Sequence, residues 1–199
     1  MMRTTCLLIS TLLTFTAIAD ANELVIGGPC QGCENVFVNM PKKIKSDSRI
    51  SPTEEQGEPL KITGNVFTQE GKPAPNIIVY AYQTDATGKY PKSDTFHGKL
   101  RGWAKTDLSG AYSFNSIRPV AYPNGREPQH IHFHVIEPNR GTYYIDDITF
   151  SDDPLLSADK KSKTLCRGGC GLSEPKKNKA GVWLVTRDII LGENIPGYH

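Results

Sequence analysis

The chain has 199 residues, of which 38% are hydrophobic and 22% are charged, and its formal net charge is +2. This length fits one domain, and the composition supports a globular core, which excludes disorder for the body of the chain. The small net charge argues against nucleic acid or an anionic membrane surface as the partner.

The first residues have the pattern of a secretory signal peptide. Arg3 supplies a positive start, residues 6–17 form a mostly apolar stretch, and the small residues Ala17-Ile18-Ala19 follow. The apolar stretch is too short to span a bilayer, although a membrane anchor or a buried terminal helix is the alternative. We therefore predict a signal peptide over residues 1–21, no membrane anchor, and export to a bacterial periplasm or out of the cell.

Export changes how the cysteines of the mature chain are interpreted. The four that remain are Cys30, Cys33, Cys166 and Cys170. In an oxidising compartment they suggest two disulfides, with three possible connectivities. The local pairs Cys30–Cys33 and Cys166–Cys170 are preferred, and bridges between the two segments stay open. The spacing also fits a zinc site, which an oxidising compartment disfavours.

The mature chain divides into an arm and a body. Residues 22–58 are rich in Gly, Pro, Lys and Ser and show little periodicity. We predict an irregular N-terminal arm here, packed across the domain or against another subunit of a homo-oligomer. One domain is predicted over residues 59–199.

The body shows one strand pattern after another and no long helical period. Alternating or β-branched runs predict strands over residues 60–67, 77–82, 103–106, 111–114, 131–136, 143–150 and 181–191. The turn at residues 107–110 is expected to join its two neighbouring strands as a hairpin. Short strands separated by turns predict an all-β fold, a single-domain β-sandwich.

The strongest chemical signal is the run His130-Ile131-His132-Phe133-His134. In a strand, these three imidazoles project from one face, with neighbours roughly 6.5–7 Å apart. Such a row suggests a metal site, and a polar, solvated sheet face is the alternative. Histidines alone suit zinc, copper or iron. Asp146 and Asp147 are candidate ligands if strand pairing brings them near.

Two tyrosines narrow the choice of metal. Tyr90 follows the strand predicted over residues 77–82, and Tyr122 lies eight residues before His130. Each alone is ordinary packing. Phenolate is a hard anionic ligand, however, and together with imidazole it favours ferric iron over softer or divalent ions.

In these residues the sequence resembles the intradiol ring-cleavage dioxygenases, the family of the catechol and protocatechuate enzymes. The resemblance runs from about Leu60 to Leu191 and is carried by residues 79–90, 106–114, 117–123 and 128–133. It implies Fe(3+) as the cofactor, held by Tyr90, Tyr122, His130 and His132. It also implies an oxidoreductase of aromatic-compound catabolism that opens a catechol-type diol with O2 to a muconate-type diacid.

The resemblance further implies a role for each tyrosine. Tyr122 is similar to the axial tyrosine that leaves when the diol binds and takes one of its protons. Tyr90 is similar to the equatorial tyrosine that stays. His134 is then a packing or second-layer residue, and His97 has no context that assigns it a role.

One position departs from the family pattern. The family usually has Arg three residues before the first ligand histidine, where it stabilises charge on the activated substrate, and here that position is Glu127. Because an electrostatic donor in a site is worth roughly 3–4 kcal/mol, we predict that Arg126 replaces it as a catalytic residue. The short segment between Tyr122 and His130 leaves the substrate open.

Two other functions fit parts of the sequence. The strand pattern would also suit a non-catalytic, transthyretin-like β-sandwich. The histidine row would suit a periplasmic metal-binding protein that holds copper or zinc with His130, His132 and His134. Neither alternative needs Tyr90 and Tyr122 as ligands.

Overall fold

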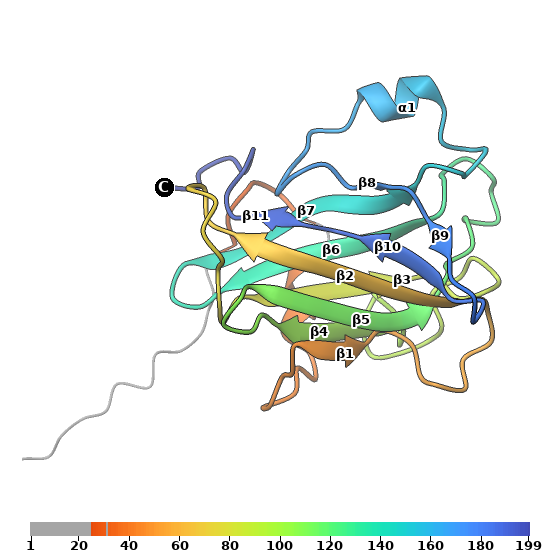
Figure 1. Ribbon diagram of the computed structural model, residues 1–199, viewed down its shortest axis with the longest axis horizontal. Coiled ribbons are helices and arrows are strands. Elements are labelled where there is room, and N and C mark those ends of the chain that lie inside the picture. Colours follow the sequence, from red (N-terminus) through yellow and green to blue (C-terminus); the bar gives the residue numbers. More distant parts are fainter. Residues whose placement is uncertain (1–24, 31) are drawn as a thin grey trace, which may run out of the picture.

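The computed structural model describes residues 25–30 and 32–199 (Figure 1). The signal peptide predicted over residues 1–21 lies outside the described residues. Within the described part of the chain, no helix combines the length and the apolar character needed to cross a bilayer.

Two β-sheets pack face to face as a sandwich (Figure 1), which confirms the predicted all-β fold. The first sheet contains, in spatial order, β1 (Asp47–Arg49), β5 (Ala111–Ile117), β2 (Pro59–Phe67), β10 (Trp183–Thr186) and β9 (Lys176–Lys177), with β11 (Ile189–Ile190) also paired to β2. The second sheet contains β4 (Arg101–Lys105), β3 (Ile78–Gln83), β6 (His130–Glu137), β7 (Gly141–Phe150) and β8 (Leu172–Ser173). The helices are the 3-10 helix η1 (Cys33–Phe37) and the short α1 (Ala158–Ser162).

The strands form where one side chain in two is apolar, since alternate side chains of a strand face the same layer. In β2, for example, Leu60, Ile62 and Val66 are buried while Lys61, Thr63 and Asn65 are more exposed. The core between the sheets is filled by such side chains from both layers, among them Phe114 of the first sheet and Phe133 of the second.

The hairpin predicted around residues 107–110 is wrong. The turn joins β4 to β5, but β4 pairs with β3 in the second sheet and β5 pairs with β2 in the first. The Asp107 carboxylate accepts backbone N–H bonds from Ser109 at 2.8 Å and Ala111 at 3.0 Å, so the turn is closed without pairing its flanking strands. Alternation reveals a buried face but not the sheet to which a strand belongs.

The strand predicted over residues 181–191 is two strands. β10 ends at Thr186 and β11 begins at Ile189. Between them the fully buried guanidinium of Arg187 donates to backbone carbonyls, including those of Gly168 at 3.2 Å and Gly169 at 2.9 Å. This side chain fixes the loop that carries the Cys166–Cys170 disulfide.

Residues 33–44 of the predicted arm cover the outer face of the second sheet, while β1, also in the arm, pairs with β5 at the edge of the first sheet. Val36 of η1 packs with Tyr80, Trp103 and Ile136 in a second, smaller core. The indole N–H of Trp103 donates to the Val36 carbonyl at 2.8 Å. The two local disulfides form as preferred, Cys30–Cys33 in this arm and Cys166–Cys170 in the C-terminal part.

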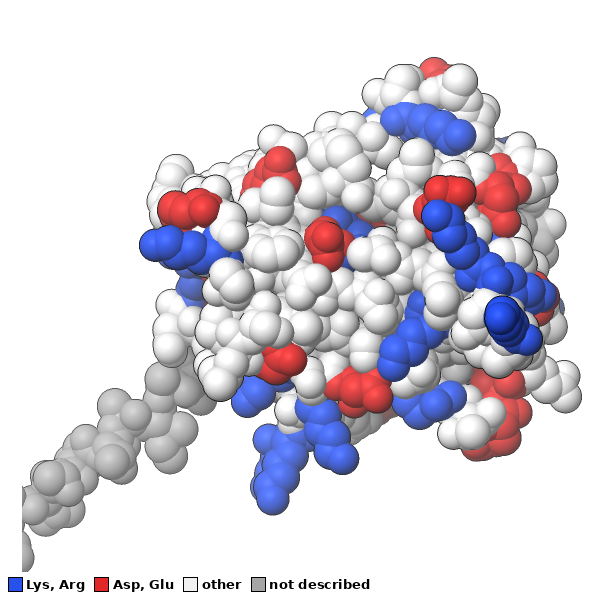
Figure 2. Space-filling model, in the orientation of Figure 1, with Lys and Arg blue, Asp and Glu red and all other residues white. Residues whose placement is uncertain are grey.

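Charges on the opposite layer are mixed. Figure 2 shows Lys and Arg interspersed with Asp and Glu over the face that carries β2, β5 and β10. Several form ion pairs, such as Lys61 with Asp47 at 3.0 Å and Lys177 with Glu58 at 2.6 Å.

Candidate metal centre

The outer face of the second sheet is lined by aromatic rings and imidazoles. In the antiparallel pairing of β3 with β6, Tyr82 lies opposite His132 and Tyr80 lies opposite His134. The side chains of Ile131 and Phe133 point the other way and are fully buried between the sheets. Strand alternation therefore places these imidazoles outside the sandwich core, as the sequence pattern predicted.

His130 and His132 come closer together than regular strand spacing allows. Their Nε2 atoms are 3.2 Å apart, whereas side chains two residues apart on a strand are roughly 6.5–7 Å apart. The pairing of β6 with β7 changes register between Ile131 and Phe133, at the centre of this segment. The two rings lean toward one point at this irregularity.

The two tyrosines come from neighbouring loops that pack against each other. The loop before Tyr90 turns at Gly88, which has a φ of +74°, and a Cβ there would lie 2.1 Å from the Ala121 carbonyl oxygen. Only glycine permits this approach, since it favours positive φ and lacks Cβ. The approach brings Tyr90 next to Tyr122.

Four side-chain atoms meet where the loops reach the strand. The Tyr90 hydroxyl oxygen is 2.7 Å from the Tyr122 oxygen and 2.9 Å from Nε2 of His132. The Tyr122 oxygen is 3.1 Å from Nε2 of His130 and 3.5 Å from Nε2 of His132. The structure thus brings together all four residues that the sequence predicted as ligands.

These separations fit a single metal ion. Nitrogen and oxygen ligands lie about 2.0–2.1 Å from an ion such as zinc, so two ligands at right angles are roughly 3 Å apart. The set offers two phenol oxygens and two imidazole nitrogens, which is a hard donor set.

The far nitrogens of the two imidazoles are already held by the protein. Nδ1 of His130 is 2.7 Å from the Pro128 carbonyl, which only accepts, so this nitrogen carries the proton and donates. Nδ1 of His132 is 3.0 Å from the carboxylate of Asp147. Both bonds leave Nε2 as the free ligand atom and aim it at the tyrosine oxygens.

Asp147 therefore does not have the position of a metal ligand, which was the role considered for it from the sequence. Its carboxylate lies on the Nδ1 side of the His132 ring, while the tyrosine oxygens lie on the Nε2 side. Burial raises the pKa of Asp147, but the attraction of His132 outweighs it and the carboxyl pKa ends below its ordinary value. Asp146, the other candidate, accepts the backbone N–H of Cys166 at 2.8 Å instead.

Burial dominates the electrostatics of the ligand atoms. It raises the pKa of Tyr90 well above the ordinary value for a phenol, with the hydrogen bond that Tyr90 donates to Tyr122 adding to the effect, and it also raises the pKa of Tyr122. Burial lowers the pKa of His130. Burial thus favours the neutral forms of Tyr90, Tyr122 and His130, and a bound cation is the charge that would favour phenolates.

Two further histidines lie beside the four ligand candidates. His134 is 3% exposed and its Nδ1 is 3.9 Å from Sγ of Cys33, while His97 is 2% exposed and its Nδ1 is 2.8 Å from the Tyr80 hydroxyl. Burial lowers the pKa of His97 to about 4 and that of His134 to about 3. Sequence reasoning gave His97 no role, because its contacts come from distant parts of the chain.

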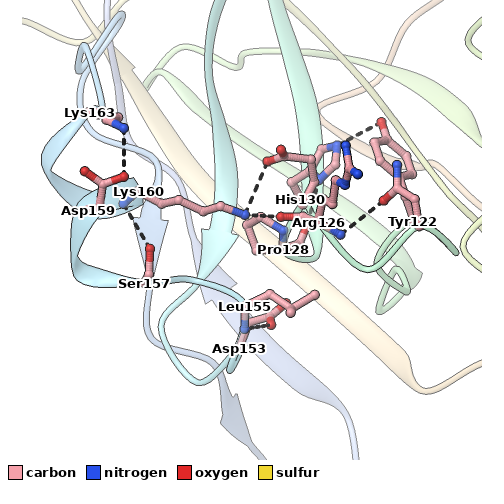
Figure 3. Close-up of polar contacts among 12 residues, drawn as sticks. Tyr122, Arg126, Pro128, His130, Asp153, Leu155, Ser157, Asp159, Lys160 and Lys163 are labelled. Atoms are coloured by element: carbon pink, nitrogen blue, oxygen red, sulfur yellow. Dashed lines mark hydrogen bonds and ion pairs between the residues drawn. The ribbon is translucent and has the colours of Figure 1, made fainter.

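Arg126 lies on a solvent-exposed loop beside the site (Figure 3). Glu127 pairs with Lys160 of α1 at 3.6 Å, and the Lys160 amino group also donates to the Arg126 carbonyl. Figure 3 shows the Lys160 side chain reaching from α1 to this loop. Lys160 lines the cavity in front of the tyrosines, and Arg126 is not among the described residues that do.

That cavity has a volume of about 660 Å³. Tyr90, Tyr122 and His132 are among its lining residues. The cavity provides room for an organic ligand beside the donor atoms of these three residues.

Comparison with known proteins gives one family. A protein-family model described as Dioxygenase matches residues 34–168. The chain is 35% identical over 120 residues to the protocatechuate 3,4-dioxygenase beta chain of Burkholderia cepacia, covering 53% of this chain and 50% of that one. It is 31% identical over 139 residues to catechol 1,2-dioxygenase 2 of Acinetobacter lwoffii, covering 60% and 50%. The chain spans about half the length of these curated relatives.

Solved structures show the same fold. The dioxygenase domain of a dioxygenase carbohydrate-binding protein fusion from Streptomyces sp. SirexAA-E superposes with a TM-score of 0.60 at 22% identity, covering 76% of this chain and 91% of that one. The catechol 1,2-dioxygenase of Acinetobacter radioresistens superposes with a TM-score of 0.60 at 20% identity, covering 79% and 62%. At these identities the superpositions describe the β-sandwich alone.

Proposed function

Because the chain belongs to the intradiol ring-cleaving dioxygenases, an oxidoreductase family, we propose that it cleaves a catechol-type diol with O2 to a muconate-type diacid. Membership confirms the resemblance read from the sequence. The observation that carries the proposal is the convergence of the Tyr90 and Tyr122 oxygens with Nε2 of His130 and His132, at separations of 2.7–3.5 Å.

The proposed cofactor is Fe(3+), held by Tyr90, Tyr122, His130 and His132. Two phenol oxygens suit a hard trivalent ion, which distinguishes this set from a zinc or copper site built on histidine alone. When bound, the ferric ion supplies a Lewis-acidic centre that a diol chelates and that favours loss of its hydroxyl protons.

The two tyrosines have different supports, and this suggests different roles. The ring of Tyr90 lies roughly parallel to that of His132 with centroids 6.4 Å apart and tilted to that of Tyr82 at 6.0 Å, whereas the ring of Tyr122 meets His130 edge-on at 5.0 Å. Tyr122 comes from a loop whose residues 123–127 are exposed. We assign Tyr122 as the residue whose phenolate oxygen would take a proton from the diol, and Tyr90 as a residue that would hold the ion throughout.

Stabilisation of negative charge on the substrate requires a cation near the site. Arg126 remains our proposed catalytic residue for this role. Lys160 is the competing candidate, because it lines the cavity. Arg126→Ala and Lys160→Ala, compared in the same assay, distinguish the two residues. The larger loss of turnover identifies the cation that stabilises negative charge on the substrate.

The deciding experiment is reconstitution of the purified protein with ferric iron. Phenolate-to-ferric charge transfer should give a broad visible band and a burgundy-red colour. Tyr122→Phe should shift this band and slow oxygen uptake with catechol, while Tyr198→Phe, a change far from the site, should leave both unchanged. A colourless reconstituted protein would contradict the proposal, and metal analysis would then test the periplasmic metal-binding alternative.

Export is proposed on separate grounds. The two local disulfides support an oxidising compartment, since disulfides rarely persist in a reducing cytosol. Fractionation of cells that express the full chain, followed by mass determination of the product, tests both export and cleavage after about residue 21.

A further inference from the structure

The cavity in front of the proposed iron site is larger than a catechol ring requires. Its volume of about 660 Å³ lies in the range of roughly 300–1,000 Å³ that is typical of sites for drug-sized ligands. A single six-membered ring with two hydroxyl groups would occupy only the part against Tyr122 and His132. The outer part of the cavity is therefore left for a substituent.

The outer part is apolar and exposed. Phe96, Leu165 and Leu172 line it, and they are 82%, 67% and 45% exposed. Seven large hydrophobic side chains of the described residues are exposed, and three of them meet at this one cavity. They come from three separate segments: the β3–β4 connection, the loop after α1, and β8. Exposed apolar side chains that gather at one place mark a binding surface.

An aromatic ring adds to this surface. Tyr144 of β7 lines the same cavity, and the guanidinium carbon of Arg167 lies 3.7 Å from its ring centroid on the protein side. The Arg167 side chain also donates to the Gly27 carbonyl at 3.1 Å, so the guanidinium that packs against the Tyr144 ring is itself held in place. A fixed aromatic surface favours stacking of another aromatic ring.

The cations at the cavity are already paired. Lys160 pairs with Glu127 at 3.6 Å, and Lys163 pairs with Asp159 at 2.7 Å. Asp146 and Asp147 add acidic groups to the same lining. This lining does not favour a negatively charged substituent on the substrate.

We propose that the natural substrate is a catechol that carries a bulky, uncharged aryl substituent, bound against Phe96, Leu165 and Leu172. The inference rests on the proposed function. When both hydroxyl groups face the iron site, a substituent at ring position 4 points away from them, toward the cavity mouth. A substituent at position 3 lies beside the reacting oxygens. The expected substrates are therefore aryl-substituted at position 4.

The test compares catechol, 4-phenylcatechol and protocatechuate on the iron-loaded protein. Anaerobic titration calorimetry gives the dissociation constants without turnover, and oxygen uptake gives kcat/KM. Burial of a phenyl group at an open rim should favour 4-phenylcatechol over catechol by about tenfold in both measurements. Protocatechuate, whose carboxylate finds no excess of positive charge in the lining, should bind no better than catechol.

Substitutions at the cavity rim, formed by Phe96, Leu165 and Leu172, test whether these residues cause the preference for 4-phenylcatechol over catechol. Phe96→Ala combined with Leu165→Ala should reduce the preference for 4-phenylcatechol by at least about threefold. Leu108→Ala is the matched control, because Leu108 is 90% exposed on the β4–β5 turn and does not line the cavity. The substituted side chains are on the surface, so all three changes should leave the melting temperature unaltered.

The outcomes separate this inference from the proposed function. If catechol is bound and cleaved but 4-phenylcatechol is not preferred, or if the rim variant keeps the full preference, the inference is wrong and the function stands. A clear preference for protocatechuate would also overturn it. If no catechol binds or is cleaved by the iron-loaded protein, the proposed function fails and the inference falls with it.

Discussion

Two clusters of histidine and tyrosine lie side by side on the outer face of the second sheet, and the geometry of their polar atoms differs. The ligand cluster is formed by Tyr90, Tyr122, His130 and His132. The buried cluster is formed by Tyr80, His97 and His134. In the ligand cluster, four donor atoms converge within 2.7–3.5 Å. In the buried cluster, one hydrogen bond joins Tyr80 to His97, and Nε2 of His97 has no hydrogen-bond partner among the described residues.

The difference comes from what surrounds the same residue types. Pro128 and Asp147 hold the Nδ1 atoms of the ligand cluster and direct Nε2 toward the tyrosine oxygens. The arm with its Cys30–Cys33 disulfide lies against the buried cluster, where the Cys33 sulfur is 3.9 Å from His134. Three histidines on one strand face thus split into two ligand candidates and one packing residue, and the second layer of contacts decides which is which.

Removal of one imidazole from each cluster should give the largest difference between the two clusters. His132→Ala deletes a proposed ligand, so we expect loss of the visible band and a fall in oxygen uptake of more than about a hundredfold, beyond the cost usual for second-layer changes. His134→Ala should keep bound iron and instead lower the melting temperature, because it leaves a hole beside the disulfide. Iron analysis and thermal unfolding of both variants give the answer. Loss of iron in His134→Ala would place that residue among the ligands.

Asp147 tests the second layer of the ligand cluster alone. Asp147→Ala removes the carboxylate that holds Nδ1 of His132 at 3.0 Å, and we expect iron affinity to fall by about 10–100-fold. Asp147→Asn keeps an acceptor but loses the charge and should lie between that variant and the native protein. Competition with a chelator measures the affinities, with Asp152→Asn as a surface control. An unchanged affinity in Asp147→Ala would show that the ring of His132 is held by packing alone.

Protonation of His97 in the buried cluster should make the stability of the protein depend on pH. Burial lowers the pKa of His97 to about 4, below the ordinary value of 6.5, so the unfolded chain binds more protons than the folded one between these values. This contribution is fully present above pH 6.5 and is lost as the pH falls toward 4; at pH 5 the loss is about 2 kcal/mol.

His97→Gln provides the comparison, because glutamine does not titrate. Denaturant unfolding at pH 7.5 and pH 5 should show a smaller loss of free energy for this variant than for the native chain. His199→Gln at the C-terminus, where the side chain has no such burial, serves as control. Equal losses in native and His97→Gln proteins would remove His97 as the source.

The sequence predicted the ligand cluster better than the buried cluster, for a physical reason. The His130–His132 pair follows from strand periodicity, which is local, and the two tyrosines follow from the family resemblance. The contact of Asp147 with His132 depends on how β7 pairs with β6, which the sequence left open. The stacking of His97 on Tyr82 joins a loop to a strand, and no periodic pattern marks it. The wrong hairpin at residues 107–110 has the same cause, since pairing is a property of the whole sandwich.

Tyr82 is a member of neither cluster but contacts both, and it therefore allows the finest test of their separation. Its ring stacks on His97 with centroids 3.7 Å apart and on His132 at 4.4 Å. Tyr82→Leu removes both stacks and should cost about 1 kcal/mol of stability, while Tyr82→Phe keeps both rings in contact and serves as the matched control. If Tyr82→Leu also shifts the visible band of the iron-loaded protein and Tyr82→Phe does not, then the buried cluster sets the angle at which His132 meets the metal. If only stability changes, both clusters contact the Tyr82 ring, but the buried cluster does not influence the proposed metal site.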